Sequence, residues 1–236
     1  MKTNNQTPVI ELSQVSFTWP GNDSPTLAIP QLQVNQGEHL FVKGPSGCGK
    51  STLLSLLTGI NTVTTGKVTV LNQCLSDLPG NQRDKFRADH IGYIFQQFNL
   101  LPYLSVIENV TLPCRFSKQR RSQVSGDLQT EAKALLNKLH LSESLMNKPV
   151  VELSIGQQQR VAAARALIGK PKIIIADEPT SALDEANRQA FIELLFAQTD
   201  KTGATVVFVS HEQSLAPLFS KVVHLDELQG GADDLA

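Results

Sequence analysis

The sequence predicts an α/β fold whose core is interrupted by a helical insert. Strand-like segments alternate with a helix over roughly the first 97 residues, and the same alternation resumes after residue 169. Between them, from about residue 99 to residue 169, only helical patterns occur. With 41% hydrophobic and 18% charged residues among 236, the chain has the composition of a globular protein with a sizeable buried core.

The N-terminal part is predicted to be mostly strands, with one helix. The segment VIELSQVSFTW (9–19) alternates between apolar and polar residues, as a half-buried strand does. The helix is KSTLLSLLTG (50–59), ending at Gly59, with Leu53, Leu54 and Leu57 as its apolar stripe. Further strands are expected at LQVNQG (32–37), EHLFVKG (38–44), GKVTVLN (66–72) and IGYIFQ (91–96).

The apolar residues of the insert repeat with helical spacing, whereas the C-terminal part alternates again between strands and helices. In LQTEAKALLNKLHL, the residues Ala132, Leu135, Leu136 and Leu139 share one helical face. The segment KIIIADE is apolar on both faces, which is typical of a buried parallel strand. We then expect a helix at 184–203, a strand at 204–210, a helix at 212–220 and a last strand at 221–228.

Charge and cysteine content narrow the class of protein. The net charge of −1 argues against a nucleic-acid partner, and we expect the basic run SKQRRS (117–122) to be a solvated loop. Three cysteines without CxxC spacing favour a reduced, intracellular protein. The N-terminus shows no apolar leader, and no apolar run approaches the roughly 18 residues that span a membrane. If the protein works at a membrane, another chain provides the membrane part.

A phosphate-binding loop is predicted between a strand and a helix. The stretch GPSGCGKS fits G-x-x-x-x-G-K-[ST] in the strand–loop–helix context that this motif needs. Glycines let backbone N–H groups turn toward phosphate oxygens, and the helix N-terminus adds partial positive charge. Lys50 is suited to reach the β- and γ-phosphates, and the Ser51 hydroxyl is suited to bind Mg²⁺. The expected nucleotide-binding residues are Gly44, Pro45, Ser46, Gly47, Cys48, Gly49, Lys50, Ser51 and Thr52.

Polar residues follow three of the predicted strands. Asp177 and Glu178 end a buried strand, at the edge where parallel sheets bind ligands. Asp177 is suited to hold Mg²⁺ through water, and Glu178 to polarise the attacking water in phosphoryl transfer. His211 follows another strand, which favours a contact with the γ-phosphate. Gln96 closes IGYIF, so its amide is suited to meet Mg²⁺ or the water.

The stretch LSIGQ (153–157) adds an anion site without a phosphate loop beside it. Ser154 and Gly156 precede a predicted helix, and Ser at a helix start with exposed N–H groups suits an anion.

Taken together, these motifs resemble the ATP-binding cassette (ABC) ATPases over about residues 9–225. GPSGCGKS is similar to the Walker A motif, Gln96 to the Q-loop, LSIGQ to the signature, IIIADE to Walker B, SALD (181–184) to the D-loop, and His211 to the H-loop. The resemblance implies a P-loop NTPase (RecA-like) core with an N-terminal antiparallel β subdomain. It makes the chain a single ABC ATPase domain, with 1–97 and 170–236 as the nucleotide-binding core and 98–169 as a helical signature subdomain.

The resemblance also implies a head-to-tail homodimer with ATP and Mg²⁺ at each shared site. Ser154, Gly156 and Gln157 would then face the γ-phosphate of ATP on the partner subunit. Asp184 would belong to the D-loop, and an aromatic from the first strand would stack on adenine. Trp19 is the candidate and Phe17 the alternative. The implied catalytic residues are Glu178, His211 and Gln96, and the implied metal ligands are Ser51, Gln96 and Asp177.

One position departs from the family pattern. The commonest signature is LSGGQ, and Ile155 replaces its first glycine. A β-branched residue still offers its backbone N–H, but it does not adopt a positive φ cheaply. We therefore expect a tolerated variant with modestly altered dimerisation or rate.

The segment after Gln96, QQFNLLPYLSVIENVTLP, resembles small ABC ATPases of the lipoprotein-release and macrolide-export (LolD- and MacB-like) type. That type implies a separate permease and a place on the cytoplasmic face of the bacterial inner membrane. Cell-division and cell-wall ATPases are close alternatives. The segment's apolar residues either receive the permease's coupling helix or pack the insert's own core; they are Phe98, Leu100, Leu101, Tyr103 and Leu104.

Three other classes fit less well. A soluble ABC ATPase of DNA repair or translation normally carries a long coiled coil or two fused cassettes, which 236 residues do not hold. A catalytically silent cassette would lack Lys50 or Glu178. A nucleotide kinase has no reason to carry LSIGQ.

Overall fold

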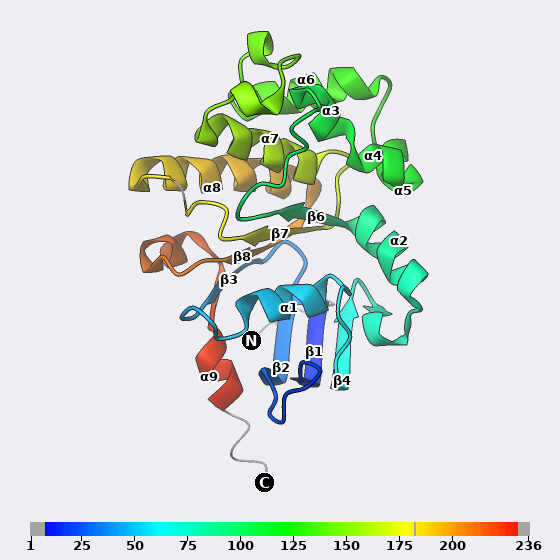
Figure 1. Cartoon of the computed structure of the whole chain (residues 1–236), viewed down its shortest axis with the longest axis vertical. Coiled ribbons are helices and arrows are strands. Elements are labelled where there is room, and N and C mark those ends of the chain that lie inside the picture. Colours follow the sequence, from blue (N-terminus) through cyan, green and yellow to red (C-terminus); the bar gives the residue numbers. More distant parts are fainter. Residues whose placement is uncertain (1–7, 182, 231–236) are drawn as a thin grey trace, which may run out of the picture. The chain divides into compact units, whose positions relative to one another are not determined.

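The computed structural model describes residues 8–181 and 183–230 (Figure 1). The described residues separate into two compact units, 8–87 with 205–230 and 88–204. The expectation of no N-terminal leader rests partly on residues 1–7, which lie outside the described residues, as does Ala182 of the D-loop motif. The expected α/β fold is confirmed, whereas the subdomain limits at residues 98 and 169 remain a prediction.

The first unit contains an antiparallel sheet with strand order β2-β1-β4-β5. In β1 the apolar residues of the predicted alternation, Ile10, Leu12, Val15 and Phe17, are all buried. Leu12 pairs with Leu32 on one side and with Val68 on the other, so one apolar face is continuous across three strands. The strands are β1 (Pro8–Phe17), β2 (Leu27–Asn35), β4 (Thr65–Val70) and β5 (Gln73–Cys74).

The same unit holds three parallel strands in the order β8-β3-β9. Their core is aromatic, because Phe41, Phe208 and Phe219 pack with ring centroids 5.0–6.1 Å apart. The strands are β3 (His39–Lys43), β8 (Thr205–Val209) and β9 (Lys221–His224); the helical elements are α1 (Lys50–Leu57), η1 (Leu75–Asp77), η5 (Gln213–Leu218) and α9 (Leu225–Gly230).

The second unit combines one parallel strand pair with most of the helices. Figure 1 shows α3, α6 and α7 together, and these helices are in contact. No strand forms in the described stretch 99–169, as predicted, and Ala132, Leu136 and Leu139 of the expected face are buried. The elements are β6 (Ile91–Ile94), β7 (Ile173–Asp177), α3 (Val106–Thr111), α4 (Pro113–Phe116), α5 (Lys118–Ser122), α6 (Leu128–Lys138), η2 (Glu143–Leu145), η3 (Val150–Glu152), α7 (Ile155–Leu167), α8 (Glu185–Thr199) and η4 (Asp200–Thr202).

Three elements differ from the sequence-based expectations. Helix α2 (Gly80–His90) was not predicted, because none of its residues is buried and it shows no apolar stripe. The last expected strand is shorter: β9 ends at His224 and α9 begins at Leu225. The helix expected at 212–220 is a 3₁₀ helix with Pro217 inside, whose missing N–H disfavours an α-helix.

The prediction that the basic run 117–122 is a solvated loop is wrong. The run contains helix α5, and Arg120 is only 3% exposed. Its guanidinium donates hydrogen bonds to carbonyls at the C-terminal end of α7 and at β6, including Ile168, Ala166 and Ile91. A buried cation at a helix C-terminus complements the helix dipole.

The two arginines of α7 also donate to backbone carbonyls. Arg160 donates to the His140 carbonyl at 3.0 Å. Arg165, at 9% exposure, donates to the carbonyls of Phe98 and Asn99. Both arginines of α7 therefore bind backbone of neighbouring loops.

Replacement of Arg120 by Met should lower the free energy of unfolding by about 3 kcal/mol, because several buried carbonyls lose a charged donor. Urea denaturation followed by circular dichroism measures this. The control is Arg121→Met, at an exposed neighbour, which should stay within about 0.5 kcal/mol of the unsubstituted protein. Equal effects of the two substitutions would contradict the assigned role.

Candidate functional site

The phosphate loop lies between β3 and α1 of the first unit, as predicted. Gly47 and Gly49 have φ of 84° and 99°, in the region that favours glycine. A Cβ on Gly49 would lie 2.9 Å from Cδ2 of Leu27, so packing as well as backbone geometry requires glycine there. Lys50 begins α1, and the loop therefore presents the N-terminus of this helix.

The Lys50 ammonium is held by the loop itself. Its Nζ donates to the carbonyls of Gly44 and Pro45, both at 2.8 Å, and the residue is 8% exposed. Among the described residues of the first unit, no carboxylate forms an ion pair with it. Carbonyl dipoles leave the net charge uncompensated, and an anion in the loop would supply that compensation. The Ser51 side chain follows at the helix start and Thr52 is buried.

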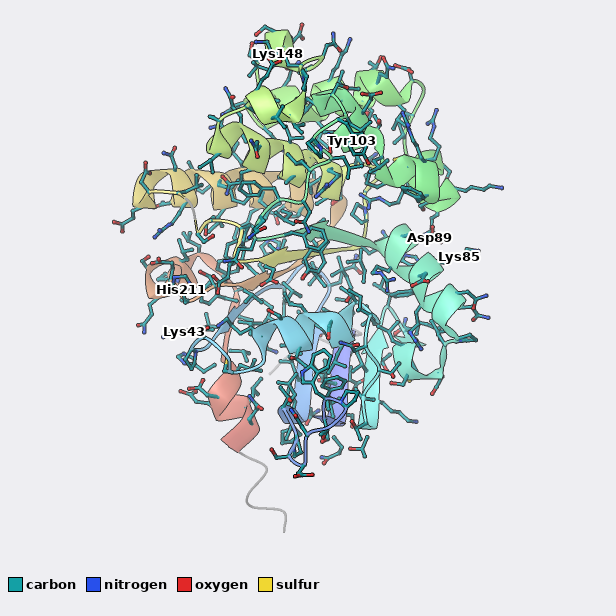
Figure 2. The ribbon with its side chains drawn as sticks, viewed as in Figure 1. Lys43, Lys85, Asp89, Tyr103, Lys148 and His211 are labelled. Carbon is teal, nitrogen blue, oxygen red and sulfur yellow. The ribbon has the colours of Figure 1, made fainter. Side chains whose placement is uncertain are left out.

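His211 lies at the same strand edge as the phosphate loop. β3 and β8 are parallel neighbours with Val42 opposite Val209, and the Ser210 N–H donates to the Val42 carbonyl at 3.3 Å. Figure 2 labels Lys43, the last residue of β3, and His211, which lies two residues beyond the end of β8. The His211 side chain is 55% exposed, with Nε2 3.6 Å from Oε1 of Glu212.

Trp19 follows the end of β1 and is 40% exposed, whereas Phe17 is 6% exposed. The two rings pack edge to face at 4.9 Å. Of the two candidates for adenine stacking, Trp19 therefore has the accessible ring and Phe17 supports it from the core.

Gln96 and Asp177 lie at a second strand edge, in the second unit. β6 and β7 are parallel with Ile94 opposite Ala176, so Asp177 and the turn containing Gln96 follow neighbouring strand ends. Tyr93, which the sequence did not single out, places its hydroxyl 3.5 Å from Oδ2 of Asp177. Burial, followed by the charge of Asp177, raises the pKa of Tyr93, which keeps this hydroxyl protonated as a donor.

Glu178 has an unusual backbone for a residue with a side chain. Its φ is 43°, in the left-handed region, immediately after the strand that ends at Asp177. Such conformations cost free energy and cluster at functional sites. The Ser181 N–H donates to the Glu178 carbonyl at 3.2 Å and closes the turn.

The signature stretch caps helix α7. Ser154 Oγ accepts from the Gln157 N–H at 3.4 Å, and Gln157 Oε1 accepts from the Ser154 N–H at 2.9 Å, which makes a reciprocal capping box. Ile155 is the first helical residue, with an ordinary negative φ, and its side chain is 55% exposed. Isoleucine therefore imposes no backbone strain here. A Cβ on Gly156 would meet nothing within 4 Å, so Gly156 leaves open space at the helix start.

A cleft of about 590 Å³ brings the signature and the D-loop together. Ser154, Ile155 and Gly156 line it with Asp184, which caps α8 by accepting from the Asn187 N–H at 2.9 Å. The backbone hydrogen bond from Asn187 lowers the pKa of Asp184. The first unit thus carries the phosphate loop, His211 and Trp19, and the second carries the other predicted site residues.

The apolar segment after Gln96 is held in place by hydrogen bonds from the side chain of Asn109 in α3. Asn109 of α3, fully buried, exchanges hydrogen bonds with both backbone groups of Leu101 and donates to the Leu104 and Ser105 carbonyls. Phe98 is buried, Leu100, Leu101 and Leu104 are half-buried, and Tyr103 (labelled in Figure 2) is 78% exposed. Of the five residues expected to bind a partner or pack inward, Phe98 packs inward and Tyr103 faces solvent.

Residues 27–181 match the ABC transporter family. The chain is 38% identical over 221 residues to the ABC transporter ATP-binding protein MJ0796 of Methanocaldococcus jannaschii, covering 93% of this chain and 94% of the relative. It is 40% identical to the ABC transporter ATP-binding protein YbbA of Escherichia coli, with 83% of each covered. Identity is 37% to the macrolide export ATP-binding/permease protein MacB of Syntrophobacter fumaroxidans, covering 92% of this chain but 30% of that protein.

The chain therefore belongs to the ABC transporter family. Within it, the chain is an ATP-binding cassette of the ATPase class, and its relatives are consistent with the lipoprotein-release and macrolide-export type. The structure of MJ0796 as a dimer in a post-hydrolysis state bound to ADP and Pi superposes with a TM-score of 0.80 at 35% identity, over 92% of this chain and 94% of that one.

Replacement of Ile155 by Gly should change the ATPase rate only modestly, because the N1 position needs no positive φ. Stability should fall by about 0.5–1 kcal/mol, since glycine is a poor helix former. Steady-state phosphate release and thermal unfolding measure the two effects. A rate gain above about tenfold would show that the isoleucine cripples the natural site.

Proposed function

We propose that two copies of this chain form a head-to-tail dimer that hydrolyses ATP at shared sites and drives a separate membrane permease. The carrying observation is the buried lysine of the phosphate loop, which is held by backbone carbonyls, in a chain that also presents Asp177 and the left-handed Glu178 at a strand end. Such a lysine is prepared for a phosphate, and such a pair of carboxylates for a metal and a water.

The residue roles follow from their chemistry and placement. The phosphate loop, Gly44–Thr52, holds the phosphates with backbone N–H groups, and Lys50 adds charge. Glu178 polarises the attacking water, while Gln96 and His211 orient the water and the γ-phosphate. Trp19 stacks on adenine. Ser154, Gly156 and Gln157 of the partner subunit complete the site, together with the D-loop that ends at Asp184.

Mg²⁺ fits the donor set of this chain. The Ser51 hydroxyl, the Gln96 amide oxygen and the Asp177 carboxylate are hard oxygen ligands of the kind that Mg²⁺ prefers. Tyr93 donates toward Asp177 and orients its carboxylate. The ion would neutralise phosphate charge when bound, and the chain's own residues supply the remaining positioning.

A membrane partner is part of the proposal. None of the described helices is long and apolar enough to cross a bilayer. We assign the chain to the cytoplasmic face of the bacterial inner membrane, bound to a permease of the lipoprotein-release or macrolide-export type. Tyr103 lies on backbone fixed by Asn109 and presents an exposed aromatic ring, which suits a docking contact for the permease's coupling helix. A membrane machine of cell division or cell-wall regulation is the alternative.

Replacement of Glu178 by Gln should nearly abolish hydrolysis and trap an ATP-bound dimer, because binding groups remain while the water loses its polarising carboxylate. Gel filtration with ATP and phosphate-release assays measure both effects. The companion variant Lys50→Ala should instead lose nucleotide affinity and stay monomeric. Fast turnover in Glu178→Gln would remove this residue from its assigned role.

Replacement of Tyr103 by Ser should weaken permease binding about tenfold, because exposed aromatic anchors dominate many interfaces. Co-purification of tagged protein from detergent-solubilised membranes measures it, and the ATPase rate of the isolated chain should not change. The control is Phe116→Ser, an aromatic residue 75% exposed on α4. Capture of soluble partners alone would argue against the membrane role.

A further inference from the structure

Helix α7 holds the loop that carries Glu178. Gln159 of this helix is 2% exposed, and its Nε2 donates to the Pro179 carbonyl at 3.0 Å. That carbonyl is the only hydrogen-bonding backbone group of Pro179, because proline has no N–H. On the other side, Arg188 Nε of α8 donates to the Thr180 carbonyl at 3.2 Å. The two carbonyls that follow the left-handed Glu178 therefore accept hydrogen bonds from two helices, that of Pro179 from α7 and that of Thr180 from α8.

The same helix holds the loop that carries Gln96. The Arg165 guanidinium donates from Nη1 to the Asn99 carbonyl at 2.6 Å and from Nη2 to the Phe98 carbonyl. Phe98 and Asn99 have φ of 59° and 48°, so this fork stabilises two consecutive left-handed residues. Burial lowers the pKa of Arg165 to about 10, and the side chain remains charged at neutral pH.

At its N-terminus α7 also carries the signature, in which Ser154 caps the helix. Gln159 and Arg165 follow on the same continuous helix, and Arg165 lies about 16 Å from Ser154 along the axis. The helix is continuous over 13 residues, which suits it to transmit a displacement along its axis. The helix therefore connects the signature to both loops through direct hydrogen bonds from Gln159 and Arg165.

We propose that Gln159 and Arg165 are positioning residues that couple the signature end of α7 to the Glu178 and Gln96 loops. The proposal rests on the proposed function, because it needs ATP on the partner subunit at the signature. Occupancy of one shared site then orders the catalytic loops that serve the other, which makes hydrolysis cooperative in ATP.

The test uses Gln159→Met and Arg165→Lys in the full chain. Methionine keeps the volume of glutamine without its donors, and lysine keeps the charge of arginine without its planar fork. In the unsubstituted protein we expect a Hill coefficient above one. In the variants we expect this coefficient to fall toward one and kcat to fall about tenfold, with little change in KM for ATP. Phosphate release over a range of ATP concentrations gives all three quantities.

Arg120→Lys is the matched control. Arg120 is likewise a buried arginine bound to carbonyls, with its pKa lowered to about 10 by burial. It donates to the carbonyls of Arg165, Ala166 and Ile168, and so anchors the C-terminal end of α7, but its hydrogen bonds go to neither catalytic loop. The comparison therefore separates direct contact with the loops from anchoring of the helix. This variant should lower the melting temperature while kcat and the Hill coefficient stay within about twofold of the unsubstituted values at a temperature where it is folded. An equal kinetic loss in Arg120→Lys would reduce Gln159 and Arg165 to structural residues and overturn the proposal.

A second measurement separates this proposal from the proposed function. Gln159→Met and Arg165→Lys, each combined with Glu178→Gln, should still form the ATP-dependent dimer, because no nucleotide-binding group is removed. Unchanged kcat and Hill coefficient in the single variants, with the dimer intact, would overturn the coupling alone. Failure of Glu178→Gln itself to dimerise with ATP would instead refute the proposed function.

Discussion

Parallel pairing of strands is the constraint on which the site depends. Parallel neighbours end at the same edge, so residues that follow different strands meet without being close in sequence. The register Val42–Val209 gathers the phosphate loop and His211, and Ile94–Ala176 gathers Gln96 and Asp177. In each case the buried apolar strands fix the position of the backbone, and the polar site residues lie at or just after the C-terminal ends of these strands.

Backbone carbonyls, more than carboxylates, hold the buried cations of this chain. Lys50, Arg120 and Arg165 all donate to carbonyl oxygens. A carboxylate partner would cancel the positive charge. Carbonyl oxygens accept the hydrogen bonds of the cation without cancelling its charge. For Lys50 this preserves an attraction for phosphate. For the two arginines it gives a rigid link between elements, because one planar group spans several carbonyls.

Much of the site was predictable because its signals are local. Glycine spacing, a lysine and a following apolar helix define the phosphate loop within nine residues, and KIIIADE defines the strand before Glu178. Helix α2 escaped prediction because it buries nothing and has no apolar period. Arg120 and Gln159 escaped because their partners lie 20 to 48 residues away, and only the tertiary fold turns such polar side chains inward. The positive φ of Glu178 has no sequence signature at all.

The capping box at Ser154 bears on how readily the assembly comes apart. In the free chain, Ser154 and Gln157 already satisfy one another's backbone N–H groups. If subunits of the proposed dimer separate, the N–H groups of Ser154 and Gln157 therefore keep hydrogen-bond partners within their own chain. In the proposed cycle the two subunits separate after each hydrolysis event, and this capping box lowers the free-energy cost of that separation because the helix start keeps its hydrogen bonds in the free subunit.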